Sequence, residues 1–156
     1  MSGSDVVLKT TPAMLVASYQ LTVPNNDQVP FYFEKAHHQL WAFIKEHGLN
    51  VIGPHMTIWH QGPEVMENEV VEVTFAIDAA APSHAEIQVY CLPETQVASY
   101  VHQGNFEEFQ TGHKILLRWI EENGYRAAGG YREIYLKHDP ADLSNSATEI
   151  QFPVEK

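Results

Sequence analysis

The chain has 156 residues, of which 44% are hydrophobic, and this is enough for one domain with a sizeable buried core. With 20 acidic and 9 basic side chains its formal net charge is −11, and no lysine or arginine cluster occurs, so direct binding to nucleic acid or to an anionic membrane is not expected. The single cysteine, Cys91, excludes an internal disulfide and a cysteine-based zinc site.

The N-terminal residues 1–9 lack the charged-then-apolar pattern of a signal peptide. No stretch approaches the roughly 18 apolar residues that a membrane-spanning helix requires. We therefore expect a cytoplasmic protein that does not enter a membrane.

The first half of the sequence predicts two strands, a helix and two further strands. Pro12 divides the first two strands, and Pro30 suits the first turn of the helix. Apolar residues then recur every three or four positions as far as Gly48, which is typical of a C-terminal cap. The predicted strands are residues 6–10, 13–23, 55–61 and 70–78.

The second half repeats this order of elements. Pro93 divides its first two strands as Pro12 does in the first half. Asn105 is a candidate N-cap with Glu108 three residues later, and Gly124 ends the predicted helix. The predicted strands are residues 87–92, 96–102, 129–136 and 148–154, with a polar loop over residues 138–147.

Two matches between the halves indicate an internal duplication. Residues 16–19 and 97–100 both read Val-Ala-Ser-Tyr. Residues 43–48 align with residues 119–124 at an offset of 76 (119 minus 43). The agreement of the prolines, the helix ends and the strand order supports a true repeat.

Each repeat, about 5–80 and 85–156, is too small to bury a core well by itself. We therefore predict a single α+β domain over residues 1–156. Its two pseudo-twofold β-α-β-β repeats form an antiparallel sheet backed by two helices. A central cleft where the repeats join is the expected ligand site.

One predicted strand places a carboxylate between two phenol rings. Tyr131, Glu133 and Tyr135 alternate with their neighbours and therefore point to one face. Burying an ionised carboxylate costs several kcal/mol unless a partner compensates the charge. Glu133 is thus expected either to meet a ligand cation or to be a structural carboxylate held by Arg132, Arg126 or backbone donors.

Several segments of the second half occur together in the order and spacing of a known family. They are Val97-Ala98, His102 to Phe106, Trp119 to Gly124, Arg132 to Leu136 and Thr148 to Val154. In the first half, Gly53-Pro54 and Ile58-Trp59-His60 match more loosely. With these segments the chain resembles the GyrI-like small-molecule-binding family, which includes effector-binding domains of AraC-type and multidrug-sensing transcription regulators.

This resemblance implies a central pocket for flat, lipophilic and often cationic compounds. It also implies a functional glutamate near the pocket floor, and the residue in the matching Glu-x-Tyr position is Glu133. Other family members inhibit gyrase, and some hydrolyse the reactive cyclopropane of DNA-alkylating natural products. Most regulators of this kind carry a DNA-binding domain, for which this chain has no residues to spare, so direct transcriptional control is not expected.

Aromatic residues are the remaining candidates for ligand contacts, because each ring face adds roughly 0.5–2 kcal/mol to cation binding. Trp59, which the 76-residue offset places on Tyr135, either enters the cleft from the other repeat or belongs to an ordinary core. Tyr19 and Tyr100 either line the pocket or cover the sheet. The full set of candidates is Glu133, Tyr135, Trp59, Tyr19, Tyr100, Tyr90 and Phe152.

The 9 histidines do not have the spacing of a metal site. His37 and His38 are adjacent and face apart, while His55 and His60 point to opposite faces of a strand. His102 either orders the turn before a helix or donates a proton in a reaction. Because no phosphate loop, dinucleotide motif or Gly-x-Ser-x-Gly segment occurs, we expect neither a metal nor another cofactor.

Our leading hypothesis is a stand-alone cytoplasmic module that captures lipophilic, cationic aromatic compounds, with Glu133 balancing the charge while Tyr135 and Trp59 stack. The second hypothesis is a hydrolase of cyclopropane-bearing or other strained electrophiles, in which Glu133 positions or deprotonates a water. The third is a protein-interaction role, such as gyrase inhibition, with gyrase or a separate regulator as partner. The ligand, the protein partner and the oligomeric state are left open.

Overall fold

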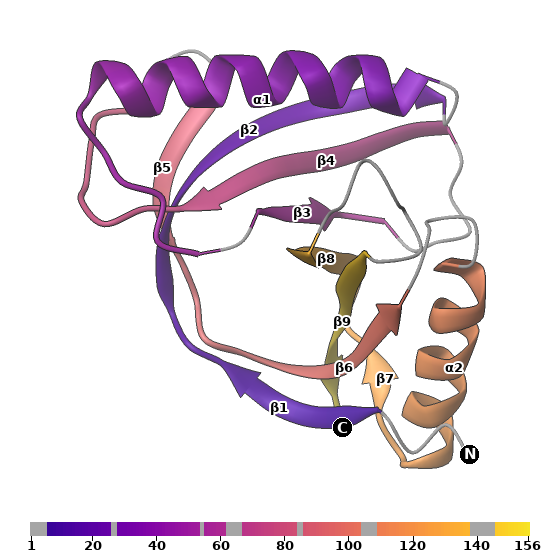
Figure 1. Cartoon of the computed structure of the whole chain (residues 1–156). Helices are drawn as coiled ribbons and strands as arrows, with labels where there is room; N and C mark the ends of the chain where they lie inside the picture. The colour runs from indigo at the N-terminus through magenta and orange to yellow at the C-terminus, as the bar shows by residue number, and fades with distance from the viewer. Residues whose placement is uncertain are drawn as a thin grey trace.

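The computed structural model describes residues 6–25, 28–53, 55–61, 67–83, 86–103, 109–137 and 146–156. Its helices are α1 (Val29–Glu46) and α2 (Phe109–Glu122). Its strands are β1 (Val7–Thr11), β2 (Met14–Asn25), β3 (Met56–Trp59), β4 (Glu67–Ala76), β5 (Ile87–Leu92), β6 (Thr95–Gln103), β7 (Arg126–Ala127), β8 (Tyr131–Lys137) and β9 (Ala147–Glu155). The strands form one antiparallel sheet in the order β1-β6-β9-β8-β3-β4-β2-β5, and β7 pairs with β9 (Figure 1).

The predicted α+β fold, an antiparallel sheet with two helices, is confirmed. The predicted end of the second strand at Val23 is wrong, because β2 continues through Pro24 to Asn25. Proline is tolerated there because β5 pairs with β2 only as far as Tyr19, so one side of β2 needs no N–H donor beyond that point. The two-residue strand β7 was missed. The predicted N-cap at Asn105 lies outside the described residues, as do Glu108 and residues 138–145 of the predicted loop.

A long two-stranded ribbon connects the two halves of the sheet. β1 pairs with β6 and β2 pairs with β5, and the same register continues from Val7↔Ser99 to Tyr19↔Ile87. Pro12 and the Pro93-Glu94 pair lie in the breaks between these strands. In Figure 1 the ribbon curves around one side of the molecule, and the pairing of β3 with β8 joins the two halves of the sheet a second time.

The two helices end in the same way, as the glycines at their C-termini predict. Gly48 and Gly124 both have positive φ values, 65° and 76°. The amide of Leu49 then donates to the carbonyl of Ile44 at 3.0 Å, and Tyr125 makes the equivalent bond to Ile120 at 3.0 Å. These matching caps lie 76 residues apart and support the proposal that the domain arose by internal duplication.

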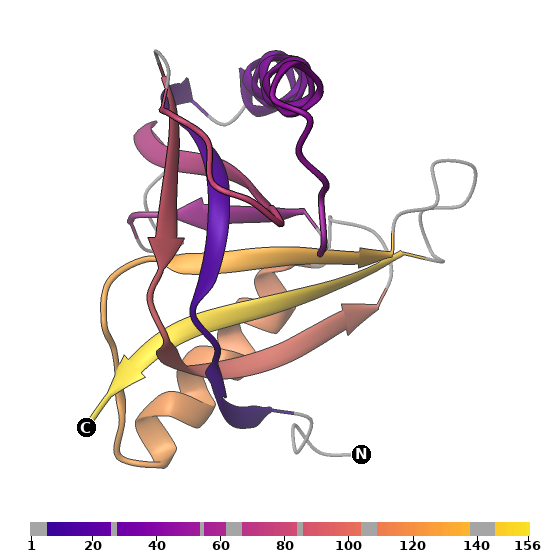
Figure 2. The ribbon, with the colours of Figure 1, turned by 90° about the vertical axis from the view of Figure 1, so that its left-hand side faces the viewer.

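Both helices lie on one side of the sheet, which we call the helical face. α1 contacts β2 and β4, whereas α2 contacts β6, β7 and β9, so the helices are well separated (Figures 1 and 2). Two buried clusters lie on this face, one under each helix. A third cluster, made of Val16, Met56, Leu92 and Ile134, includes no helix residue and defines the helix-free face.

Candidate functional site

Glu133 lies in the middle of β8, on the helical face, with only 7% of the residue exposed. Across the sheet it is paired with Thr57 of β3 on one side and Ile150 of β9 on the other. Its Oε1 accepts hydrogen bonds from the indole Nε1 of Trp59 at 3.0 Å and the hydroxyl of Tyr135 at 3.1 Å. The Tyr135 hydroxyl lies 2.8 Å from Oγ1 of Thr57, which completes a chain of polar groups.

Burial raises the pKa of Glu133 to about 7, although the hydrogen bonds from Trp59 and Tyr135 act in the opposite direction. The nearby Glu69 adds to the rise, and burial raises the pKa of Glu69 as well. Burial and the charge of Glu133 raise the pKa of the Tyr135 phenol well above its usual range, so Tyr135 remains a hydrogen-bond donor. Near pH 7 both the protonated and the ionised form of this carboxyl group are therefore populated.

Neither arginine considered as a partner of Glu133 contacts it. Arg132 follows the alternation of the strand and points to the helix-free face, where it donates to Thr95. Arg126 instead pairs with Glu155 at 2.9 Å. Among the described residues, no lysine or arginine forms an ion pair with Glu133.

The indole that donates to Glu133 belongs to a group of rings that we call the aromatic cluster: Phe33, Trp59, His113, Tyr131 and Phe152. Trp59 stacks on Tyr131 with ring centroids 6.0 Å apart, and Tyr131 stacks on Phe152 at 5.3 Å. α1 contributes Phe33, 5.8 Å from Trp59, and α2 contributes His113, whose edge meets Tyr131 at 4.7 Å. The cluster thus joins both helices to the seam between β3 and β8.

His113 brings a second buried titratable group to this cluster. It is 8% exposed, and its Nδ1 has no hydrogen-bond partner in the part of the chain that the structure describes. Burial, with a smaller effect of His102, lowers the pKa of His113 to about 4, so the ring is neutral at pH 7. The equivalent residue of α1 is His37 (113 minus 76). Its buried Nε2 likewise has no partner among the described residues, and burial lowers its pKa. Both helices thus place a neutral imidazole with one buried nitrogen against the sheet at equivalent positions.

The structure brings together only some of the predicted site residues. Tyr135 and Trp59 bond to Glu133, and Phe152 joins them through Tyr131. The others are distributed elsewhere: Tyr19 lies in the cluster under α1, Tyr100 packs against the core under α2, and Tyr90 lies on the helix-free face.

The predicted site residues did not include five residues of the site: Phe33, Thr57, Glu69, His113 and Tyr131 as a stacking partner. Strand alternation from Trp59 would have identified Thr57, and alternation from Glu133 had already placed Tyr131 on the same face. Nothing local marks Glu69 or His113, since each reaches the site through the packing of a distant element.

Among the described residues, no three histidine, cysteine, aspartate or glutamate side chains are arranged to hold a metal ion. In the same part of the chain, neither helix combines the length and apolar character needed to cross a bilayer.

Comparison with known proteins gives one family and several similar structures. The family model for the GyrI-like small molecule binding domain matches residues 4–155. The crystal structure of the EcmrR C-terminal domain is 26% identical with a TM-score of 0.87, and the match covers 97% of each chain. In the cryo-EM structure of an EcmrR–DNA complex the identity is 25% and the TM-score 0.84, and the match covers 97% of this chain but only 57% of that of EcmrR.

Two more distant structures share the fold. SAV2435 bound to tetraphenylphosphonium is 12% identical with a TM-score of 0.67, over 96% of this chain and 93% of its own. A hydrolase encoded by lin2189 from Listeria innocua is 14% identical with a TM-score of 0.72, and the match covers 97% of this chain and 92% of the hydrolase chain. No curated protein matches the chain.

Proposed function

The chain belongs to the GyrI-like small molecule binding domain family, and we propose that it binds lipophilic cations with aromatic groups at the aromatic cluster around Glu133. The buried carboxylate of Glu133, with no cationic partner among the described residues, is the observation that carries this proposal. A bound cation would lower the cost of ionising that carboxylate, so ligand charge and protein charge would stabilise each other.

The surrounding rings add the second element of recognition. Trp59, Tyr131 and Phe152 form a buried stack of rings, and the indole of Trp59 bonds to the carboxylate. Such rings attract cations through their π faces and also bury the apolar parts of a ligand. A hydrated inorganic ion would gain little here, whereas a lipophilic organic cation gains from both. The tetraphenylphosphonium bound to SAV2435 is a ligand of this chemistry, and it provides a suitable probe.

The charge pairing can be tested by replacing Glu133 with glutamine. Glu133→Gln removes the charge but keeps an oxygen that can accept from Trp59, so we expect tetraphenylphosphonium to bind at least about tenfold more weakly, or about 1.4 kcal/mol. Titration followed by calorimetry measures this, and so does the fluorescence of a Trp41→Phe, Trp119→Phe background in which Trp59 is the remaining tryptophan. Glu149→Gln is the matched control, because Glu149 is a buried carboxylate on the helix-free face and its loss should leave the affinity unchanged. Unchanged binding in Glu133→Gln would reject the charge-pairing role.

The affinity should also depend on pH in a defined direction. Since the pKa of Glu133 is about 7, the carboxylate is mostly protonated in mild acid and ionised above neutrality. The phosphonium charge does not titrate, so we expect affinity to rise by at least about tenfold from about pH 5.5 to about pH 8. Glu133→Gln should bind with nearly the same affinity at both values. A wild-type affinity that falls with pH would contradict the assignment.

The same geometry supports a second candidate function, hydrolysis of a strained electrophile. A carboxylate with a pKa of about 7 is a suitable general base at neutral pH, and the neighbouring Tyr135 hydroxyl is a donor within 3.1 Å of it. Incubation with a cyclopropane-bearing compound followed by mass spectrometry distinguishes the two functions. Catalytic addition of water would favour the hydrolase, whereas a stoichiometric complex with unchanged ligand would favour capture. No observation favours gyrase inhibition, which stays a prediction.

A further inference from the structure

Arg132 is the neighbour of Glu133 in sequence and lies on the opposite, helix-free face. It is 7% exposed, and burial lowers its pKa. Its hydrogen bond from Nη2 to Oγ1 of Thr95 is long, at 3.4 Å. No carboxylate among the described residues lies within ion-pair distance of it. A guanidinium has five N–H donors, and leaving a buried cation without an anionic partner is costly.

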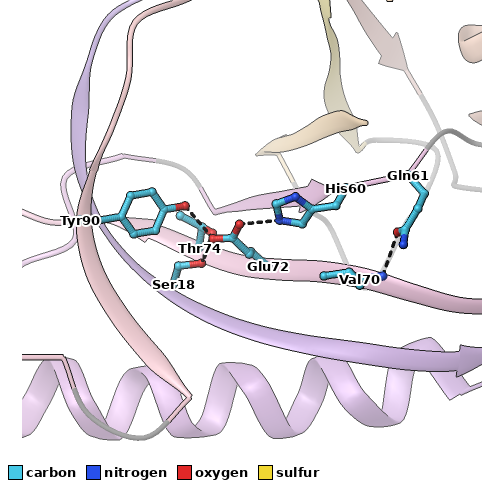
Figure 3. A network of polar contacts seen from close by, with 7 residues as sticks. All are labelled: Ser18, His60, Gln61, Val70, Glu72, Thr74 and Tyr90. Atoms are coloured by element: carbon cyan, nitrogen blue, oxygen red, sulfur yellow. Dashed lines mark hydrogen bonds and ion pairs between the residues drawn. The ribbon is translucent and has the colours of Figure 1, made fainter. Parts of the chain in front are cut away.

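The carboxylate whose charge acts on Arg132, Glu72, is already engaged by other donors. Its Oε1 accepts from the hydroxyls of Ser18 and Tyr90, both at 2.6 Å, and its Oε2 lies 2.6 Å from Nε2 of His60. Figure 3 shows the carboxylate of Glu72 held between Tyr90 and His60. Glu72 and Tyr90 act on the Arg132 charge through space and raise its pKa, but Glu72 does not pair with it. Among the described residues, the guanidinium of Arg132 therefore has the long bond to Thr95 and no paired carboxylate.

Apolar surface continues from this arginine. The cluster of the helix-free face includes the buried Met56 and Ile134, and the partly buried Ile58 and Tyr90 pack against it. Ile58 is the register partner of Arg132 on β3. A fork of N–H donors beside partly exposed apolar side chains matches a carboxylate on an apolar body, because guanidinium and carboxylate groups form two parallel hydrogen bonds.

We propose that Arg132 and this apolar cluster form a second ligand site, on the helix-free face, for an organic carboxylate. The two oxygens of the ligand accept from the guanidinium of Arg132, and its apolar body lies against Ile58 and Ile134. Glu72 and Glu149 do not prevent this, because Glu72 is held by its three donors and Glu149 is paired with Lys9. Adjacent residues of one strand thus serve opposite ligand charges on opposite faces of the sheet.

The probe for this site is 1-naphthoate, with the neutral 1-naphthalenemethanol as its uncharged counterpart. By calorimetry we expect naphthoate to bind at least about tenfold more tightly than the alcohol, and Arg132→Gln to remove that difference. Arg126→Gln is the matched control, because it removes a surface arginine with the same change of net charge. Equal naphthoate affinity in wild type and Arg132→Gln, or no preference for naphthoate over the alcohol, would overturn the proposal.

If Arg132→Gln does not fold, the wild-type protein still decides the question by NMR. Naphthoate should shift the amide signals of Thr95 and Ile134 on the helix-free face and leave the indole N–H of Trp59 unchanged. A shift at Trp59 without one at Thr95 or Ile134 would place the carboxylate at the cation site and refute a second site. Tetraphenylphosphonium should give the reverse pattern.

Discussion

Replacing Glu133 with glutamine is expected to stabilise the protein more at about pH 8 than at pH 4.5, by about 3 kcal/mol. The ordinary pKa of the carboxyl group is 4.5, and burial raises it to about 7 in the folded protein. Each unit of difference between the folded and unfolded pKa corresponds to about 1.4 kcal/mol. Chemical denaturation across this pH range measures the free energy of unfolding of both proteins.

The direction of this change in stability with pH follows from the number of protons that the folded and the unfolded state bind. Between pH 4.5 and about 7 the folded protein keeps a proton on Glu133 that the unfolded chain has released, so the stability of the wild type falls as pH rises through this window. Glutamine carries no charge at any pH and its oxygen can still accept from Trp59. The wild type therefore has a penalty above pH 7 that the variant lacks.

Glu149→Gln provides a control of opposite sign. Burial by itself raises the pKa of Glu149, but hydrogen bonds from Lys9, Ser99 and Gln151 outweigh it and lower that pKa below its ordinary value. Its ionised form therefore stabilises the fold above the ordinary pKa, and that stability is lost as pH falls. Glu149→Gln should cost more stability at about pH 8 than in acid. The same pH dependence in both variants would show that burial of Glu133 is not the cause.

The ionised carboxylate of Glu133 weakens the fold near neutral pH, so the requirements of folding do not explain why a glutamate occupies this position. Tyr135 and Trp59 would be satisfied equally well by an amide oxygen, and the packing around the residue is aromatic. Residues that reduce stability are expected where function requires them. The proposed cation is the group that would make the charge favourable, so the stability penalty and the binding energy have the same origin.

Strand alternation was sufficient to place Glu133 on one face with Tyr131 and Tyr135, because side chains alternate in any regular strand. The offset of 76 residues that places Trp59 on Tyr135 also places Thr57 on Glu133 (133 minus 57), and the structure makes these two residues register partners on β3 and β8. In a pair of repeats related by a twofold axis, equivalent residues face each other only at that axis. Glu133 therefore lies where the proposed repeats meet, and both repeats contribute side chains around it.

The partners of Glu133 could not be predicted so directly. The offset aligned Trp59 with Tyr135, but in the antiparallel pairing of β3 with β8 Trp59 lies opposite Tyr131. Its indole reaches Glu133 diagonally, which depends on the register between strands far apart in sequence. The placement of Tyr90 on the helix-free face also could not be predicted locally, because it depends on the register between β2 and β5.

Gly130→Ala is expected to destabilise the protein by more than about 3 kcal/mol, because an added methyl group has no room. A Cβ at this position would lie 1.6 Å from the carbonyl oxygen of Trp59, far inside van der Waals contact. The clash is with backbone, so no side-chain rotation relieves it, and β8 would have to move away from β3. Gly53→Ala is the control, since its Cβ would meet only the Cβ of Ala76 at 3.5 Å, an ordinary contact.

Denaturant unfolding followed by tryptophan fluorescence, with Trp41 and Trp119 replaced by phenylalanine, measures the destabilisation caused by Gly130→Ala. If Gly130→Ala folds, the displaced β8 should separate the indole of Trp59 from Glu133, so the fluorescence and the tetraphenylphosphonium affinity should change in the same variant. Wild-type stability with an unchanged indole signal would contradict the close approach of the two strands. Because the change lies outside the aromatic cluster, a loss of binding in a folded variant would show that the pairing of β3 with β8 positions the site.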